Sequence, residues 1–324
     1  MIKVLKTFEI DDSLWEKIVQ GFNESFDRNA TVDSFKSGFC TANQWGYAYH
    51  ALAFDDETGE LMAFNSYTPT FYKKGVNALV SGSTFIKPNY RKDFFLFYKL
   101  ITALRNQGIE NGFHIEIGVP NPNSREYARR FLKNEYVADL DYYILPRNVS
   151  ITIGNPSLRV FDGVFKFLFN IHLLIQSALC AILNYKEKEA KYSLITDTDF
   201  YKARFKSPTY SKYESGNYLG YYKMVNEDGK RVAYVFDFRC SDVRTRKALT
   251  KVVRFIFKRE KPDAVLFVGF LRLRQFTLLK VPQKLIPKPL PLTYYVLDKT
   301  RKEEFNDLAD KNSWDFGLMN FDVR

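Results

Sequence analysis

Three side chains in the first half of the chain are candidates to move a proton in catalysis: His114, Glu116 and Tyr127. Residues 113–119 are a short apolar run that predicts a buried strand, in which His114 and Glu116 point to the same face. Glu116 is a candidate general base, and Tyr127, in the next predicted helix, is a candidate general acid. Each is also typical of a structural role, as a paired strand carboxylate, a core histidine or a buried helix aromatic. The sequence leaves both interpretations open.

A second chemical feature is the start of a long apolar helix directly after a predicted strand at residues 76–86. Pro88 ends the strand, and apolar residues between 94 and 104 predict a helix from about Arg91 to Gly108. The free N–H groups and the dipole at a helix N-terminus favour a bound anion. The residues expected to line such a site are Ile86, Arg91, Lys92, Asp93, Phe94 and Phe95.

A polar turn, Pro-Asn-Pro-Asn-Ser at residues 120–124, follows the strand that carries Glu116. Proline fixes φ at two of its positions, so the turn presents the side chains of Asn121, Asn123 and Ser124 at the end of that strand. These side chains either contact a ligand or only cap the following helix, for which we expect Ser124 as the N-cap.

The excess of positive charge is confined to the second half of the chain. Residues 1–150 contain 17 Lys and Arg against 18 Asp and Glu, whereas residues 151–324 contain 31 against 19. A basic face attracts nucleotide-linked substrates, nucleic acid or anionic lipid, or it is merely solvated. Nucleic acid is not favoured, because the aromatic residues are not interleaved with the basic ones. Four residues around the start of a predicted helix at 243–258 are candidates to hold a phosphate: Arg239, Arg244, Arg246 and Lys247.

The periodicities predict an α+β fold with mostly antiparallel sheets and packed helices. Residues 1–146 predict the order β-α-α-β-β-β-α-β-α-β, with one closing strand at 137–145. The later strands, helix, buried strand and late strand at 293–298 resemble this order and suggest a duplication. We expect an N-terminal unit at residues 1–147, a helical connector at 148–191 and a basic C-terminal unit at 192–324.

One apolar stretch, residues 164–183, is about as long as a membrane span, but polar residues interrupt it. Their spacing favours an amphipathic connecting helix over a helix that binds a membrane surface or a partner, and both over a true span. The N-terminal residues lack the pattern of a signal peptide, so we expect a cytoplasmic protein. The three cysteines and three histidines show no metal-ligand spacing, so no metal site is expected.

The strand, the Pro88-Asn89-Tyr90-Arg91 turn, the long helix and the strand leading into residues 118–124 resemble the core of GNAT-fold N-acyltransferases. The tail at residues 313–323 resembles the ending of tandem GNAT proteins from bacterial surface-polysaccharide clusters. In that family the strands before and after the helix splay apart. The pantetheine arm of acyl-CoA lies between them, with its pyrophosphate at the helix N-terminus. The resemblance therefore implies two GNAT-like units in tandem and acetyl-CoA or another acyl-CoA as donor.

The resemblance also implies transfer of the acyl group to an amine, such as an amino sugar or a nucleotide-linked sugar, with Glu116 as base and Tyr127 as acid. The sequence departs from the family at its phosphate turn. There Phe94 and Leu96 stand in place of the small residues that let backbone approach phosphate. The alternative function is therefore a catalytically degenerate member that serves as a binding or assembly protein, associated with a membrane surface or not.

Overall fold

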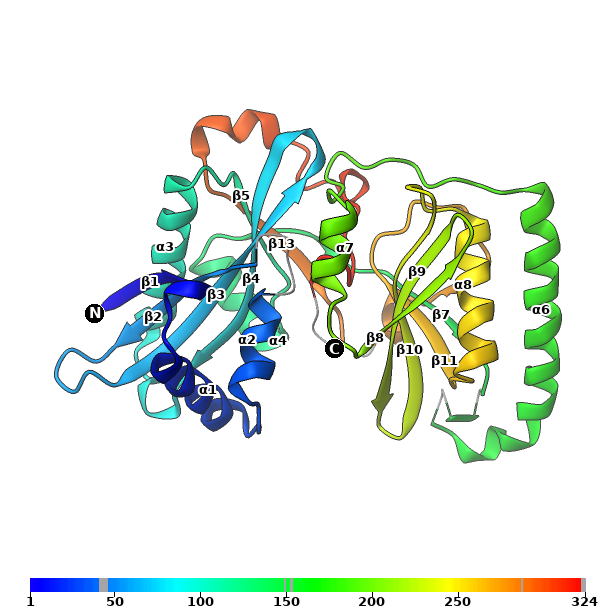
Figure 1. Cartoon of the computed structure of the whole chain (residues 1–324), viewed down its shortest axis with the longest axis horizontal. Helices are drawn as coiled ribbons and strands as arrows, with labels where there is room; N and C mark the ends of the chain where they lie inside the picture. Colours follow the sequence, from blue (N-terminus) through cyan, green and yellow to red (C-terminus); the bar gives the residue numbers. More distant parts are fainter. Residues whose placement is uncertain (41–45, 149, 152–153, 287, 322–324) are drawn as a thin grey trace. The chain divides into compact units, whose positions relative to one another are not determined.

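The computed structural model describes residues 1–40, 46–148, 150–151, 154–286 and 288–321 of the 324-residue chain. The chain forms two compact units, and both halves of the sequence contribute to each (Figure 1). The α+β class predicted from the sequence is confirmed, since each unit is a mainly antiparallel sheet with packed helices. Unit 1 comprises Met1–Asp139, Lys191–Lys206 and Leu290–Ser313, and unit 2 comprises Leu140–Ala190, Ser207–Pro289 and Trp314–Arg324.

The sheet of unit 1 has the strand order β1-β2-β3-β4-β5-β13-β6. All neighbours are antiparallel except β4 and β5, which are parallel. The strands are β1 (Ile2–Lys6), β2 (Tyr49–Phe54), β3 (Leu61–Tyr72), β4 (Val76–Ile86), β5 (Ile115–Gly118), β6 (Glu135–Asp139) and β13 (Pro291–Val296).

Helices cover both faces of this sheet. On one face α1 (Asp12–Phe26) and α2 (Val32–Cys40) bury Trp15 and Phe39 against the strands. On the other face α3 (Phe94–Glu110) and α4 (Pro122–Arg130) pack over a core that includes Leu100 and Tyr67. A further short helix, α7 (Thr198–Arg204), also belongs to unit 1.

The long apolar helix α3 differs from the expected one at both ends. It begins at Phe94 rather than near Arg91, because Asp93 is its N-cap and accepts a hydrogen bond from the Phe95 N–H at 2.9 Å. Gly108 lies inside the helix and does not end it. A Cβ at this position would lie 2.7 Å from Leu79 Cδ1, so the glycine permits close packing of α3 on the sheet.

The sheet of unit 2 has the order β12-β7-β11-β10-β9-β8, and its parallel pair is β10 and β11. In this unit α8 (Arg246–Arg259) packs on the sheet, and α6 (Asp162–Ile182) packs on α8 (Figure 1). The strands are β7 (Tyr142–Pro146), β8 (Tyr210–Ser215), β9 (Tyr218–Glu227), β10 (Lys230–Cys240), β11 (Ala264–Val268) and β12 (Leu279–Lys280).

The two units exchange strands, which the sequence did not predict. The single strand expected at residues 137–145 is two strands: β6 lies in the sheet of unit 1 and β7 in that of unit 2. In return β13, expected in the C-terminal unit, lies between β5 and β6 in unit 1. The unit boundaries therefore differ from those expected at 147 and 191. Apolar alternation identifies a strand but not the sheet that it joins.

Candidate functional site

The two parallel strands of unit 1 separate after a short paired segment. Their register pairs Ala78 with Ile115 and Val80 with Ile117, yet β4 continues to Ile86. Beyond Val80 the strand pairs with β3 alone, and an irregularity in that pairing coincides with the positive φ of Ser83. Residues 81–86 therefore have one edge without a pairing to β5.

The N-terminus of α3 lies just beyond this free part of β4. The Asp93 carboxylate already occupies the Phe95 N–H. The guanidinium group of Arg91 donates to the Ile86 carbonyl at 3.1 Å and to the Ser25 carbonyl at 3.0 Å, so it fixes the end of β4 to the end of α1. Lys92 is exposed. The turn thus offers an anion one exposed lysine, while its arginine and its helix cap make intramolecular bonds.

Aromatic side chains fill the place where the resembling family has small residues. Phe94 contacts Tyr127 and Phe131, with ring centroids 5.1 and 4.5 Å apart, and Tyr127 also contacts Phe97. The Tyr127 hydroxyl donates to the Phe94 carbonyl at 2.9 Å. Burial raises the pKa of Tyr127 above its ordinary value. The candidate acid thus joins α4 to the first turn of α3.

The candidate base Glu116 is in a buried ion pair. Its carboxylate accepts a hydrogen bond from Arg105 Nε at 2.6 Å and another from Asn134 Nδ2 at 3.1 Å, and only 2% of the residue is exposed. Arg105 also donates to the Leu132 carbonyl at 2.8 Å and lies 3.6 Å from the ring centre of Tyr295. Both carboxylate oxygens are therefore engaged within the protein.

The electrostatics of this cluster follow from its burial. Burial, the largest single influence, would lower the pKa of Arg105, but the charge and hydrogen bond of Glu116, together with Tyr67 and Tyr295, outweigh it, and the pKa is raised. The wholly buried Tyr67 lies in the same cluster. Burial first, and then the charge of Glu116, raise its pKa well above the ordinary value. The cluster thus holds one cation, one anion and a neutral phenol, an arrangement typical of a structural ion pair.

His114 is expected on the face of Glu116 but has different partners. Its Nδ1 accepts a hydrogen bond from the Asn77 N–H at 3.1 Å, and Arg301 lies against its Nε2. Burial, and then the charge of Arg301, lower the pKa of His114. The structure therefore does not bring His114 and Glu116 together in one proton-transfer pair.

The Pro-Asn-Pro-Asn-Ser turn caps α4. Asn121, rather than Ser124, is the N-cap: its Oδ1 accepts from the Ser124 N–H at 3.0 Å and from the Ser124 hydroxyl at 3.1 Å. Asn123 lies in the first turn of α4, and its side chain is outside the part that the structure describes. Of the two roles left open for this turn, capping is the one seen.

Unit 2 repeats the strand separation of unit 1. The parallel pairing joins Val232 to Ala264 and Val235 to Phe267, while β10 continues to Cys240 past an irregularity after Val235. This likeness supports the predicted duplication. The gap that begins in unit 1 beyond Val80 has its counterpart here beyond Val235.

In unit 2, however, the chain's own tail pairs with the end of β11. The Leu318 N–H donates to the Val268 carbonyl at 3.2 Å, and the Phe270 N–H donates to the Phe316 carbonyl at 2.8 Å. The intervening Gly269 N–H donates to Asp141, on the β7 side. Successive residues of a strand direct their backbone groups to opposite edges. Since Gly269 faces β7, Val268 and Phe270 face the other edge, so the tail that bonds to them lies on the β10 side. It thus occupies the place where the two strands separate.

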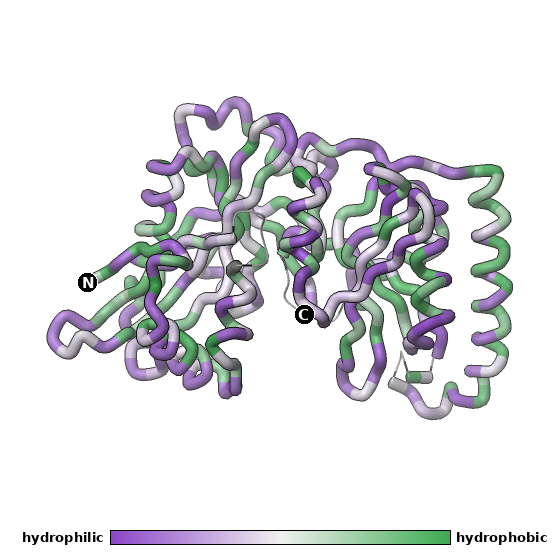
Figure 2. The backbone as a smooth tube through the Cα atoms, in the orientation of Figure 1, coloured by the Kyte–Doolittle hydropathy of each residue, from purple (hydrophilic) through white to green (hydrophobic). Residues whose placement is uncertain are grey.

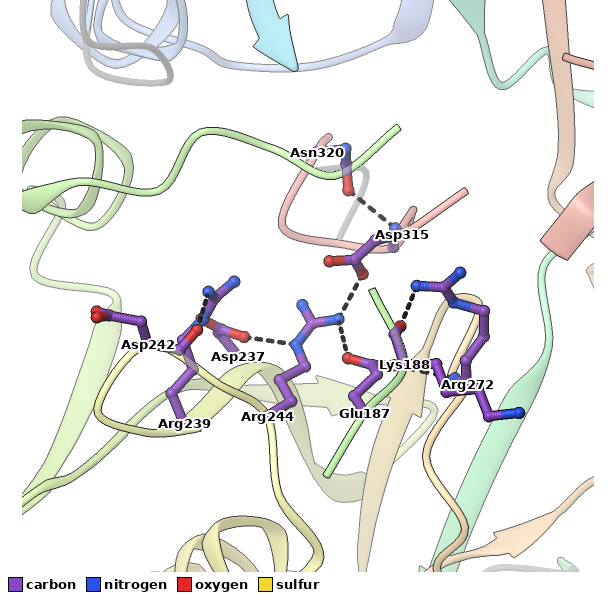
Figure 3. Close-up of polar contacts among 10 residues, drawn as sticks. Glu187, Lys188, Asp237, Arg239, Asp242, Arg244, Arg272, Asp315 and Asn320 are labelled. Atoms are coloured by element: carbon purple, nitrogen blue, oxygen red, sulfur yellow. Dashed lines mark hydrogen bonds and ion pairs between the residues drawn. The ribbon is translucent and has the colours of Figure 1, made fainter. Parts of the chain in front are cut away.

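Two of the arginines expected to hold a phosphate in unit 2, Arg239 and Arg244, bind carboxylates instead (Figure 3). The buried Arg244 pairs with Asp237 through Nε at 2.8 Å, and with Asp315 of the tail and Glu187 through Nη1. Burial opposes its charge, but the three carboxylates, Asp315 foremost, raise the pKa of Arg244 well above the ordinary value. Arg239 pairs with Asp237 at 2.7 Å. Both arginines are therefore neutralised within the protein.

The N-terminus of α8 is also satisfied internally. The N–H groups of Arg246, Lys247 and Ala248 donate to the Tyr185 carbonyl, the Asn184 side chain and the Thr245 hydroxyl, at 3.0, 3.0 and 3.1 Å. The Arg246 side chain is buried and donates to Gln176 of α6 at 2.8 Å. The four candidate residues therefore do not converge on one anion site.

Two important partners were missed in the sequence. Arg105 is the only charged residue between Lys99 and Glu110 in α3, and a lone charge in an apolar helix signals a buried counter-charge. Asp315 carries no such signal, because its partner Arg244 lies in a different segment and only the fold brings them together.

Comparison with solved structures identifies the fold of the chain, whereas no family model and no curated protein sequence matches it. Among solved structures, a probable N-acyltransferase from Enterococcus faecalis has a TM-score of 0.51 at 12% identity, covering 92% of this chain and 73% of its own. GCN5-related N-acetyltransferases from Anabaena variabilis and Kribbella flavida have TM-scores of 0.55 and 0.54 at 10% identity. They cover 92% of this chain and 73% and 71% of theirs. These likenesses show that the chain has the GNAT fold.

Proposed function

We propose that this protein is an N-acyltransferase that takes its acyl group from acetyl-CoA or another acyl-CoA bound in unit 1, and transfers it to an amine. The observation that carries the proposal is the separation of β4 from β5 beyond Val80, with α3 starting just after β4 ends. The solved structures with this fold, several of them acetyltransferases by name, support the same reaction class.

The chemistry of a pantetheine arm fits the free edge of β4. Residues 81–86 belong to β4, with a bulge at Ser83, and have one edge unpaired to β5; the amide groups of the arm can pair with such an edge as another strand would. Gly82 and Ser83 are exposed there, and a Cβ on Gly82 would meet open space. The bound thioester supplies an activated acyl group, and the amine attacks its carbonyl as the thiol leaves.

The diphosphate of CoA fits less well than its arm. The Asp93 carboxylate occupies the α3 N-terminus, and Arg91 is held by two carbonyl groups, which leaves Lys92 as the exposed cation of the turn. We therefore assign recognition of the donor chiefly to the edge of β4 and expect Lys92 to attract the phosphates.

Unit 1 is preferred over unit 2 for donor binding, because unit 2 fills the equivalent places with its own residues. Its tail pairs with β11 where the strands separate, and three backbone N–H groups at the start of α8 already have acceptors. A donor bound there would have to displace the tail and break the Arg244–Asp315 pair. An amino sugar for surface polysaccharide, free or nucleotide-linked, is our proposed acceptor and rests on the family resemblance.

Thermal unfolding with and without acetyl-CoA tests the proposal. Ligand at about 100 times its Kd adds about 2.7 kcal/mol, which raises the unfolding midpoint by several degrees. Lys92→Glu should weaken the response, whereas the matched reversal Lys247→Glu in unit 2 should leave it unchanged. Release of free thiol with amino-sugar acceptors then measures transfer. A response that is lost in Lys247→Glu and kept in Lys92→Glu would move the donor site to unit 2.

The turn at the start of α3, where Phe94 packs on Phe131 and Asp93 caps the helix, favours one alternative. In it the protein has the GNAT fold but serves in binding or assembly and does not catalyse acyl transfer. It predicts no stabilisation by any acyl-CoA and no thiol release with any amine.

A further inference from the structure

Helix α6 has two apolar faces, and only one of them is packed. Phe169, Leu173 and Cys180 are buried on the inner face, with Phe169 against Phe257 of α8 at 4.4 Å between ring centroids. Figure 2 shows that most residues of α6 are hydrophobic, and at 100° per residue those on the opposite face are apolar along the helix. We call this face the outer face of α6; it comprises Val164, Phe167, Leu168, Leu174, Ile175 and Ile182.

The outer face is unusually exposed for such residues. Phe167 is 65% exposed, Leu174 62% and Ile182 79%. Single exposed apolar residues are ordinary, but a continuous apolar face on a 21-residue helix marks an interaction surface. No other described part of the chain gathers as many exposed apolar side chains on one element.

By length and apolar composition alone, Pro156–Ile182 is able to cross a membrane. Its attachments do not fit a span. At the start of α6, Ser150 donates to the Asp162 carboxylate, and beyond its end the Tyr185 carbonyl accepts from the Arg246 N–H at 3.0 Å. With both ends anchored to unit 2 and its inner face packed on α8, the helix lies along the surface of the unit.

A row of positive charge runs beside α6. The basic stripe comprises Lys247, Lys251, Arg254 and Lys258, spaced four, three and four residues apart on one side of α8. It lies next to α6, because Arg254 donates to Ser177 of α6 at 2.7 Å. Helix α8 contains six basic and no acidic residues, and Lys166 adds a further charge on α6.

We propose that the outer face of α6 and the basic stripe together dock unit 2 on an anionic lipid bilayer. An apolar helical face enters the boundary between headgroups and acyl chains, and adjacent lysines and arginines attract acidic headgroups. A second copy of the chain fits less well, because pairing two outer faces would bring two basic stripes together. This docking does not depend on the acyltransferase proposal.

Flotation of the full chain with two kinds of vesicle tests the proposal. The protein should float with phosphatidylcholine vesicles that contain phosphatidylglycerol, less so at high salt, and not with phosphatidylcholine alone. Phe167→Asp/Leu174→Asp should abolish flotation, whereas Leu279→Asp/Leu285→Asp, two exposed leucines of unit 2 outside α6, should not. Lys247→Gln/Lys258→Gln should lower the partition coefficient about 30-fold.

The matched charge control is Lys17→Gln/Lys302→Gln in unit 1, which removes the same charge and should leave partitioning nearly unchanged. Circular dichroism of each variant verifies that it is folded. Equal flotation with neutral vesicles would overturn the role of the stripe, and no flotation with either kind would overturn the docking site. A soluble dimer or a complex with an acidic protein that Phe167→Asp/Leu174→Asp abolishes, without flotation of the parent, would also overturn it.

Discussion

Replacing Glu116 by Gln separates two roles, a proton acceptor in acyl transfer and one half of a buried ion pair. The variant removes the negative charge 2.6 Å from Arg105 Nε and leaves that cation in a site where 10% of its side chain is exposed. Breaking a buried pair on one side costs about 3–5 kcal/mol, because the remaining charge stays desolvated. Because both side chains are nearly inaccessible to water, solvent screening reduces this energetic cost only slightly. We expect Glu116→Gln to lower the free energy of unfolding by that amount.

The partner variants turn this expectation into a double-mutant cycle. Arg105→Met leaves Glu116 with the single donor Asn134, whereas Arg105→Met/Glu116→Leu removes both charges and leaves an apolar site. The double variant should cost much less than the sum of the single ones, with a coupling energy of about 2–3 kcal/mol. Urea denaturation of the four proteins measures it. A coupling energy below about 0.5 kcal/mol would refute the buried-pair interpretation.

Activity of the folded double variant decides the catalytic question. A general base contributes about 100- to 10,000-fold, so its loss would remove nearly all acyl transfer at neutral pH. We expect the double variant to keep transfer within tenfold of the parent, because both Glu116 oxygens already have protein donors. Loss of transfer in a protein as stable as the parent would instead restore Glu116 as the base.

Three further predictions concern stability. Burial lowers the pKa of His50 to about 3, so between pH 6.5 and about 3 only the unfolded state takes up a proton at this side chain. The free energy of unfolding should therefore fall by about 2 kcal/mol from pH 7.5 to 5, and by less in His50→Gln. Gly317→Ala should cost about 1–3 kcal/mol in thermal unfolding, because its Cβ would lie 2.8 Å from a backbone carbonyl, whereas Gly163→Ala meets open space and should not destabilise. Tyr127→Phe should cost about 1 kcal/mol through its bond to Phe94, with transfer within threefold; a hundredfold loss would make Tyr127 the acid.

The local elements were predictable because local chemistry determines them. Asp11, a typical N-cap residue, caps α1, and Val76–Ile86 is a strand with the expected bounds. The start of α3 was placed too early because Asp93 caps the helix from a position that the sequence offered as an anion contact. The GNAT-like order of helices and strands was predictable for the same reason. It depends on the succession of elements along the chain and not on which strands pair.

The environment of the candidate residues was not predictable, because it depends on contacts between distant segments. Alternation placed His114 and Glu116 on one face of β5, but the partners of Glu116 come from α3 and from the loop before β6. The basic residues near α8 looked available to a phosphate because their acidic partners lie elsewhere in the chain. Arg244 meets Asp315 only because the tail returns to β11.

The exchange of strands limits how the chain can be divided. A fragment of residues 1–147 has every element of the expected first unit, yet it lacks β13, which pairs with both β5 and β6. It also loses Tyr295, whose ring covers Arg105 of the buried pair. The carboxyl-terminal fragment lacks β7, which pairs with both β11 and β12. Each sheet would then expose unpaired edges in its interior, so neither fragment meets the requirement that buried peptide groups be hydrogen-bonded. The open edge of β4 in unit 1 and the filled edge of β11 in unit 2 therefore each depend on strands from both halves of the chain.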